Sequence, residues 1–233
     1  MIALHVDVPY GSFRKSFARS FAETYPLPPP ATVYGMLLSL VGEYLRTRHE
    51  GVRLAFAYKK LPRIATTLRK LSRYKYGVPS KQSSLGNAPD FVETLCDIDF
   101  LCWIDSSRER MMFEDSSNPS NTLELRLKTV LTEPGNVNRR GILCLGLSDD
   151  AVNSVSLCDR FNGDWHRLLP SQTGPIELPI WVDHVGAAHT RWRRFEFEKT
   201  ASPIIVPPGT SEWAWTEIND PRLSLKAIVD ALE

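Results

Sequence analysis

Residues 25–46, YPLPPPATVYGMLLSLVGEYLR, are the stretch that decides the fold. Its prolines hold the first part extended, because each proline fixes its own φ and disfavours the helical region for the residue before it. Pro29 or Pro30 can occupy the first turn of a helix, where the missing N–H costs nothing. Apolar residues such as Val33, Leu37 and Leu40 then recur at helical spacing, so we predict a helix over residues 31–46.

Strands are predicted on both sides of this helix. Residues 2–8 alternate apolar and polar side chains, and residues 96–105 alternate in the same way with three aspartates. Shorter runs predict strands at 54–58, 63–68 and 123–128, and the proline- and tryptophan-rich last third is expected to be β-rich. The sum is an α+β protein in which strands dominate, compatible with a ferredoxin-like or RNA-recognition-type half.

Length and composition predict an ordinary globular protein. The chain has 233 residues, of which 42% are hydrophobic and 24% charged. No stretch approaches the roughly 20 apolar residues of a membrane helix, and the first residues lack the pattern of a signal peptide, so we expect a cytoplasmic protein without a membrane partner. The four cysteines are scattered and form no Cys-x-x-Cys pair, which predicts free thiols rather than a metal or redox site.

The net charge of +1 hides two segments of opposite sign. Residues 51–89 hold nine bases and no acid, whereas residues 90–125 hold nine acids against Arg108 and Arg110. Bases interleaved with Tyr58, Tyr74 and Tyr76 fit phosphate neutralisation combined with base stacking. The alternative is that the acids lie across the fold and pair with the bases, leaving a solvated face.

The sequence predicts no catalytic centre. The five histidines have no recognised metal-ligand spacing, and the Gly-x-Ser-x-Gly, His-Glu-x-x-His and phosphate-loop motifs are absent. We therefore predict no metal and no cofactor.

Residues 25–42 resemble the N-terminal signature of the fifth Cas protein family, the subunit that holds the five-prime handle of crRNA in type I CRISPR Cascade complexes. The family has an opening strand, a Phe-containing loop, a Pro-Pro motif and a helix that begins Thr/Ala-x-x-Gly; residues 2–8, 13–21, 28–30 and 32–40 match these pieces in order. Residues 145–149 resemble the family's Leu-Gly-x-Ser/Asn-Glu segment, with Asp149 in the acidic place. Residues 178–186 and 191–195 resemble the C-terminal region of the Myxococcus-type, I-B-like subgroup.

The resemblance implies an RNA-recognition-type (RAMP) domain over residues 1–150, with a long β-hairpin thumb within about 63–101, and a β-rich region over 151–233. It implies a non-catalytic crRNA-binding subunit that caps the Cascade backbone subunits and contacts the large subunit, reaching target DNA through the complex. The predicted RNA-binding residues are basic or aromatic: Arg14, Lys15, Arg19, Tyr34, Arg63, Arg69, Lys70, Arg73, Tyr74, Lys75, Tyr76 and Lys81.

Two other functions stay open at this point. One branch of the family is a metal-independent endoribonuclease that processes precursor crRNA with a Tyr, Lys and His grouping, but no Lys-His pair occurs in this chain. The other alternative is a protein-interaction scaffold. The sequence does not distinguish antiviral defence from guided transposition.

Overall fold

This computed structural model describes residues 1–15, 21–72, 87–111, 121–139, 141–160, 162–185, 187–199, 207–209 and 214–223. For residues 69–72, 87–90, 111 and 136 it describes the backbone only. Within these ranges no helix is long and apolar enough to cross a membrane.

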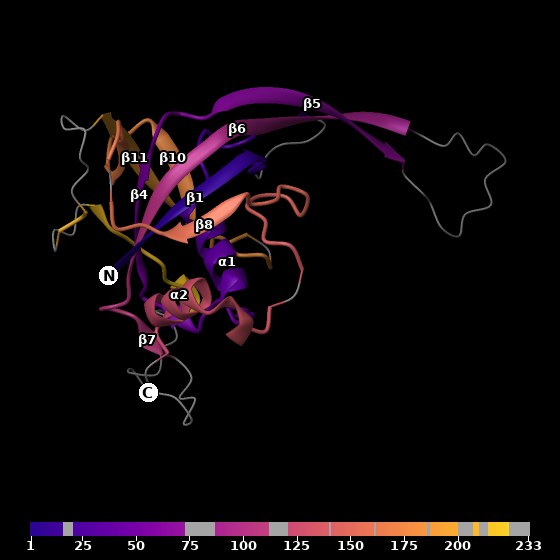
Figure 1. Cartoon of the computed structure of the whole chain (residues 1–233). Coiled ribbons are helices and arrows are strands. Elements are labelled where there is room, and N and C mark those ends of the chain that lie inside the picture. The colour runs from indigo at the N-terminus through magenta and orange to yellow at the C-terminus, as the bar shows by residue number, and fades with distance from the viewer. Residues whose placement is uncertain are drawn as a thin grey trace, which may run out of the picture.

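One sheet forms the body of the molecule (Figure 1). In the described chain it has ten strands, in the order β10-β11-β9-β4-β6-β1-β8, with β2 and β5 on β6 and β12 on β4. All of its strand pairs are antiparallel except β2 with β6. The strands of this sheet are β1 Ile2–Gly11, β2 Phe21–Ala22, β4 Arg53–Tyr58, β5 Arg63–Ser72, β6 Asn87–Asp105, β8 Ser154–Leu157, β9 His166–Pro170, β10 Ile176–Trp181, β11 Arg191–Lys199 and β12 Thr216–Glu217.

Two helices, α1 Pro30–Leu40 and α2 Leu123–Thr132, pack on one face of this sheet (Figure 1). A short 3₁₀ turn, η1 Pro134–Asn136, follows α2, and β3 His49–Glu50 pairs with β7 Arg110–Met111 as a separate ribbon. Along the chain these elements follow one another as β1-α1-β4-β6-α2-β8. Across the sheet, the four strands of this series lie side by side in the order β4-β6-β1-β8. The α+β class is confirmed, as are the strands predicted within β1, β4, β5 and β6. Strands β8 to β11 of the predicted C-terminal region join the same sheet.

Strand alternation decides which side chains enter the core. On β1, Leu4, Val6 and Val8 are fully buried against the helices, as a period of two requires. Their neighbours on β6 are Cys102, Phe100 and Ile98, so both strands direct apolar side chains to the same core. The opposite face of the sheet, which we call the outer face, carries Ala3, Leu101 and Trp103 under Trp165 and Trp215.

Strand β6 changes phase at Asp97. Leu95 and Ile98 are three residues apart, yet both are fully buried in the core shared with the helices. A regular strand would point them to opposite faces. Asp97 has φ of 59°, in the left-handed region that aspartate tolerates better than most residues, and it breaks the alternation as a bulge does. The strand can therefore serve both the sheet and the hairpin that extends from it.

Helix α1 ends earlier than predicted, at Leu40 instead of residue 46. Gly42 adopts φ of 68°, and its N–H bonds the carbonyl of Ser39 while the N–H of Glu43 bonds the carbonyl of Leu38. This pair of hydrogen bonds is the Schellman motif, which ends a helix with a residue in the left-handed conformation after its C-cap.

The predicted strand at residues 123–128 is wrong, because these residues form helix α2. Leu123, Leu127 and Val130 are buried at helical spacing, and the Thr122 hydroxyl caps the helix by accepting from the N–H of Leu125. The leucines of this segment alternate with charged residues over six positions, and so short a pattern fits a helix as well as a strand. The capping residue Thr122 favours only the helix.

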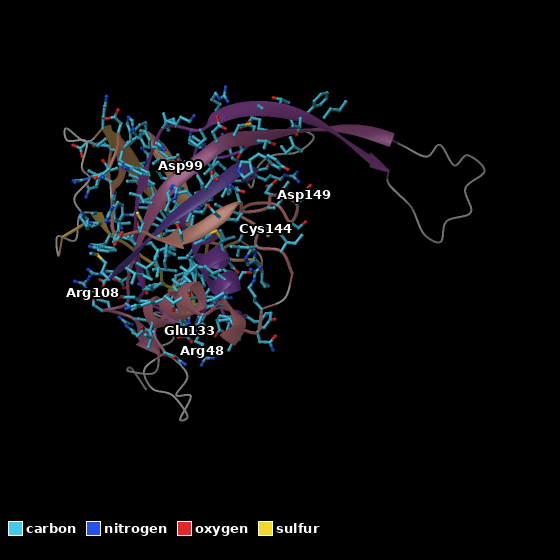
Figure 2. All side chains as sticks on the ribbon, in the orientation of Figure 1. Arg48, Asp99, Arg108, Glu133, Cys144 and Asp149 are labelled. Carbon is cyan, nitrogen blue, oxygen red and sulfur yellow. The ribbon has the colours of Figure 1, made fainter. Side chains whose placement is uncertain are left out.

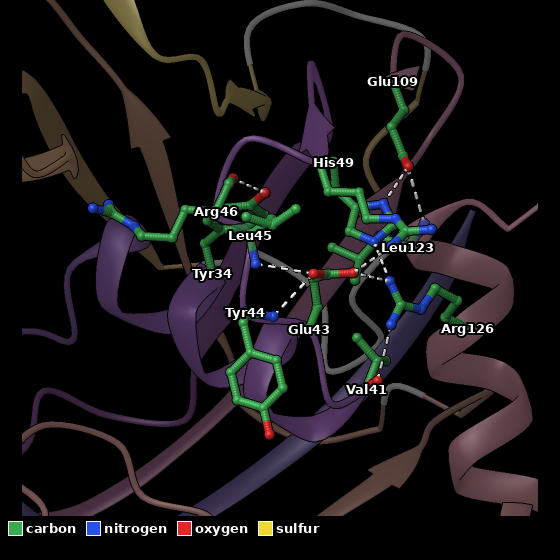
Figure 3. A network of polar contacts seen from close by, with 11 residues as sticks. Tyr34, Val41, Glu43, Tyr44, Leu45, Arg46, His49, Glu109, Leu123 and Arg126 are labelled. Carbon is green, nitrogen blue, oxygen red and sulfur yellow. Dashed lines mark hydrogen bonds and ion pairs between the residues drawn. The ribbon is translucent and has the colours of Figure 1, made fainter. Parts of the chain in front are cut away.

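A buried polar network fixes the turn after α1 against α2 (Figure 3). Arg126 of α2 donates to Glu43 at 2.7 Å, to the Val41 carbonyl at 3.0 Å and to Nε2 of His49 at 2.8 Å. Since a guanidinium only donates, Nε2 of His49 accepts, and Nδ1 carries the hydrogen donated to Glu109 at 2.5 Å. His49 and Glu109 are almost completely buried, so each depends on these partners.

Arg126→Met is expected to lower the free energy of unfolding by about 3 kcal/mol, because it removes one of the two arginine partners of the buried Glu43 carboxylate and the donor to Nε2 of His49. Lys128→Met removes the same charge from an exposed position of the same helix and should change stability by less than about 0.5 kcal/mol. Urea unfolding followed by circular dichroism measures both. Equal midpoints for the two variants would contradict the structural role of the network.

Candidate nucleic-acid interface

A long hairpin projects from the sheet (Figure 1). Strand β5 pairs with β6 over ten residues, from Arg63 opposite Cys96 to Ser72 opposite Asn87. This hairpin lies within the range 63–101 predicted for the thumb.

The base of the hairpin is neutralised by its own acids. Arg63 donates to the Asp97 carboxylate at 2.8 Å, and Lys60 lies 3.4 Å from the same group. Farther into the sheet Lys59 is 3.4 Å from Asp99. Arg53 pairs with Asp105 in the same manner, so the acids of β6 meet the bases of β4 and its following turn. For these residues the acids pair with the bases, as the alternative interpretation of the charge pattern expected. The Arg63 side chain stays 77% exposed in its pair, so its contact with RNA stays a prediction.

The pairing register of the hairpin gives different partners to Arg69 and Lys70, two further basic residues predicted to bind RNA. In the backbone register, Arg69 stands opposite Asp90 and Lys70 stands opposite Pro89. Six other predicted RNA contacts lie outside the described residues: Arg19, Arg73, Tyr74, Lys75, Tyr76 and Lys81. Their assignment stays a prediction.

Tyr34 cannot stack on a base as predicted. Its side chain is fully buried in α1 and packs 6.5 Å from the Trp181 ring. The hydroxyl donates to the Arg46 carbonyl at 2.7 Å. Burial raises the pKa of Tyr34 well above its ordinary value, so the phenol stays neutral. Tyr34 is a core residue that anchors the turn after α1.

Arg14 and Lys15 lie instead on a groove at the N-terminal end of α1. Three hollows of about 580, 510 and 650 Å³ meet there and share lining residues. The first, which contains Arg14, shares Thr32, Gly146 and Val182 with the second. It shares Tyr25 and Trp192 with the third, which contains Lys15. The groove therefore runs from the Lys15 side, past the start of α1, to Arg46 and His184.

The start of α1 turns the positive end of the helix dipole towards this groove. Pro29 is the N-cap and supplies no side-chain acceptor, and the first turn contains no acid. The helix dipole places partial positive charge at this end, where Pro29 and Thr32 line the first hollow. Gly35 lies on the exposed side of the helix, and the space where a Cβ would be is open, so no side chain covers the backbone there. A ligand backbone can approach the helix closely there.

The loop at residues 145–150 forms one wall of the groove. Asp150 is buried and accepts from the N–H of Ser12 at 2.7 Å and of Leu147 at 2.8 Å. Gly146 has φ of 116°, and a Cβ at this position would lie 2.7 Å from the Asp150 carboxylate. Asp149, which occupies the family's acidic place, is exposed at the surface (Figure 2). The buried structural acid is thus the next residue along the chain.

Trp192, Tyr25 and Asp183 complete the groove, and sequence reasoning did not assign them to it. Trp192 is 39% exposed, a large value for a tryptophan, while Tyr25 is buried beside it. Asp183 organises the loop between β10 and β11 by accepting from the N–H groups of Val185 and His189. Those backbone hydrogen bonds are the chief reason that the pKa of Asp183 is lowered. Trp192 stands in the run Arg191-Trp192-Arg193-Arg194, and an aromatic flanked by bases is the signal that could have found it.

The described residues contain no cluster of three or more histidine, cysteine or acidic side chains that could hold a metal. The features that stand out are a mostly antiparallel sheet, a projecting hairpin and a groove whose walls carry basic, acidic and aromatic side chains. Together they define an α+β protein whose surface suits a single-stranded, anionic ligand.

Comparison with known proteins gives the family. No family model matches the chain. The chain is 39% identical over 209 residues to "CRISPR-associated protein Cas5" of Myxococcus xanthus (strain DK1622), covering 89% of this chain and 93% of that protein. The chain therefore belongs to the Cas5 family of CRISPR-associated proteins, as the resemblance of residues 25–42 indicated.

One solved structure shares the fold, and a second shows a weaker similarity. A chain of a structure described as "CRISPR RNA-guided surveillance complex" aligns with a TM-score of 0.59 and 12% identity, over 98% of this chain and 99% of that one. A structure described as "Crystal structure of Cas protein" aligns with a TM-score of 0.47 and 16% identity, over 85% and 93% of the two chains.

The ion pairs at the hairpin base make a prediction about pH. Hydrogen bonds from Arg63 and Lys60 lower the pKa of Asp97. A carboxyl whose pKa is depressed in the folded state contributes stability above its unfolded-state pKa, and this contribution is lost as the pH falls through the folded-state pKa. Arg63→Gln should raise the pKa of Asp97, measured by carboxyl-carbon NMR. Arg194→Gln, which removes a cation paired elsewhere with Glu177, should not. An unchanged Asp97 titration in Arg63→Gln would contradict the pairing.

Proposed function

We propose that this chain is the non-catalytic subunit of a type I CRISPR Cascade complex that binds the five-prime handle of crRNA. In this role it caps the filament of backbone subunits and contacts the large subunit, in the prokaryotic cytoplasm, for crRNA-guided DNA targeting in defence or transposition. Membership of the Cas5 family and the fold shared with a surveillance-complex chain support this assignment.

The observation that carries the proposal is the groove at the start of α1. A single-stranded RNA presents phosphates and unstacked bases, and the groove offers a complementary surface for each. Arg14, Lys15 and the positive end of α1 suit phosphates. Trp192 suits a base. The hairpin, where Lys70 stands opposite Pro89, is proposed as a second contact for the same RNA strand.

The fold supports the same class of function. We infer that the body is a ferredoxin-like domain of the RNA-recognition type, because two β-α-β units interleave as β4-β6-β1-β8 with both helices on one face. The described outer face, which carries Asp7 and Asp99 on neighbouring strands, is less suited to RNA than the groove. This arrangement favours the groove side as the binding side.

The alternative function is metal-independent cleavage of precursor crRNA. It needs a general base close to the RNA. Among the described histidines, His184 lines the groove and His189 belongs to the same loop. Burial lowers the pKa of His184, which keeps it neutral at physiological pH and chemically able to accept a proton. A cleavage assay on repeat RNA separates this activity from binding alone.

The direct test mixes the purified protein and the backbone subunits with labelled repeat RNA. We expect salt-sensitive binding without cleavage. The double variant Arg14→Ala/Lys15→Ala should bind at least tenfold more weakly at physiological salt, and it should lower the slope of log K against log salt by about 1.4, the value for two phosphate contacts on a single strand. The control Lys59→Ala/Lys128→Ala removes the same charge from exposed positions outside the groove and should bind as the wild type does.

Three outcomes contradict the proposal. Cleavage that is lost in His184→Ala or His189→Ala supports the nuclease. If both double variants weaken RNA binding equally, the total charge of the protein governs binding and the position of the cations in the groove does not. Absence of RNA binding with the backbone subunits present favours the protein-interaction scaffold.

A further inference from the structure

Trp192 separates two hollows of the groove. It lines both the hollow of about 580 Å³ and the hollow of about 650 Å³, and Tyr25 is the other residue that the two have in common. Each volume lies in the range of small-molecule sites, about 300–1,000 Å³, and therefore can hold a nucleotide. Trp192 and Tyr25 therefore stand at the boundary between the two hollows.

Neighbouring residues hold Trp192 in place at this boundary. The Tyr25 and Trp192 rings lie 5.9 Å apart at an interplanar angle of 56°, and Tyr25 is itself buried. Trp192 stands on β11, where it pairs with Pro179 of β10 in the register. An exposed tryptophan fixed by a buried aromatic and two strands is already ordered, so stacking a base on it costs little conformational entropy.

One cation lines each of the two hollows that meet at Trp192. Arg14 lines the hollow on one side of Trp192, and its chain neighbour Lys15 lines the hollow on the other. The segment is extended here, with Arg14 bridged to Thr24, and consecutive side chains of an extended segment point in opposite directions. Two adjacent phosphates of one strand could therefore each meet one of these cations.

The acids near the groove are already engaged. Lys15 pairs with Glu23 at 3.1 Å and Arg194 pairs with Glu177 at 3.5 Å, and both pairs are exposed. Exposed ion pairs contribute little to stability, so a phosphate can replace Glu23 as the partner of Lys15 at small cost. Asp183 lines the first hollow but is buried, and backbone N–H groups that donate to its carboxylate offset part of its charge.

We propose that Trp192 is a nucleobase-stacking partition: two consecutive unpaired nucleotides of single-stranded RNA place their bases on either side of the indole, with their phosphates toward Arg14 and Lys15. The proposal rests on the proposed function for its ligand and assigns the point where the strand is gripped. Stacking is tolerant of base identity, so this site supplies affinity and register for the strand and leaves sequence readout to other contacts.

The test combines a protein variant with a change in the RNA. Abasic residues are placed one at a time along the repeat-derived handle, and binding to the protein with its backbone subunits is measured for the wild type, Trp192→Ala and Trp192→Phe. In the wild type, abasic substitution at two adjacent positions should weaken binding about tenfold each, the size of one stacking contact. Trp192→Ala should weaken binding to intact RNA by a similar or larger factor and lose its sensitivity to those two positions, and Trp192→Phe should retain most of both.

Tyr10→Ala is the matched control, because Tyr10 is 51% exposed and lies outside the groove; it should bind as the wild type does. If Trp192→Ala binds intact RNA as the wild type does, or keeps its sensitivity to the same abasic positions, the partition is overturned while handle binding stands. If the wild type shows no pair of adjacent sensitive positions, the partition is also overturned. If the wild type does not bind intact RNA at all, the proposed function fails with it.

Discussion

Strand β6 pairs with β1 and β4 inside the sheet and with β5 along the hairpin, so its alternation sets the position of every element around it. A slip of one residue would turn Phe100 and Cys102 from the helix-covered core to the outer face. The left-handed residue Asp97 lets the strand change phase between these two tasks while its carboxylate holds Arg63 and Lys60. The hairpin therefore leaves the body at a point fixed by both backbone conformation and charge.

The groove depends on what surrounds α1. At the C-terminal end of α1, the Schellman turn and the Arg126 network fix the chain against α2. At its N-terminal end, Pro29 leaves the first turn without a side-chain cap. The loop folded on Asp150 and the β10–β11 loop folded on Asp183 form walls beside that end. These buried polar groups thus support the edges of one surface, which is where a functional site needs rigidity.

Local pattern alone predicted the opening strand, the strand at 96–105 and the start of α1, because each carries one period and one type of boundary residue. It failed at 123–128, where a six-residue alternation fits a helix as well as a strand. It also placed the buried Tyr34 on the RNA and did not give the ion-pair partner of Arg63, since burial and cross-strand ion pairs exist only once the strands are in register. Trp192 was not assigned for the same reason, because the hollows beside it are made by segments far apart in the chain.

The central claim is that single-stranded RNA lies in the groove at the start of α1. Photo-crosslinking of handle RNA that carries 4-thiouridine, followed by mass spectrometry of the peptides, measures this directly. The account predicts crosslinks in the segments that contain Arg14, Tyr25 and Trp192. Crosslinks confined to the outer face of the sheet, around His5 and Asp99, would contradict it.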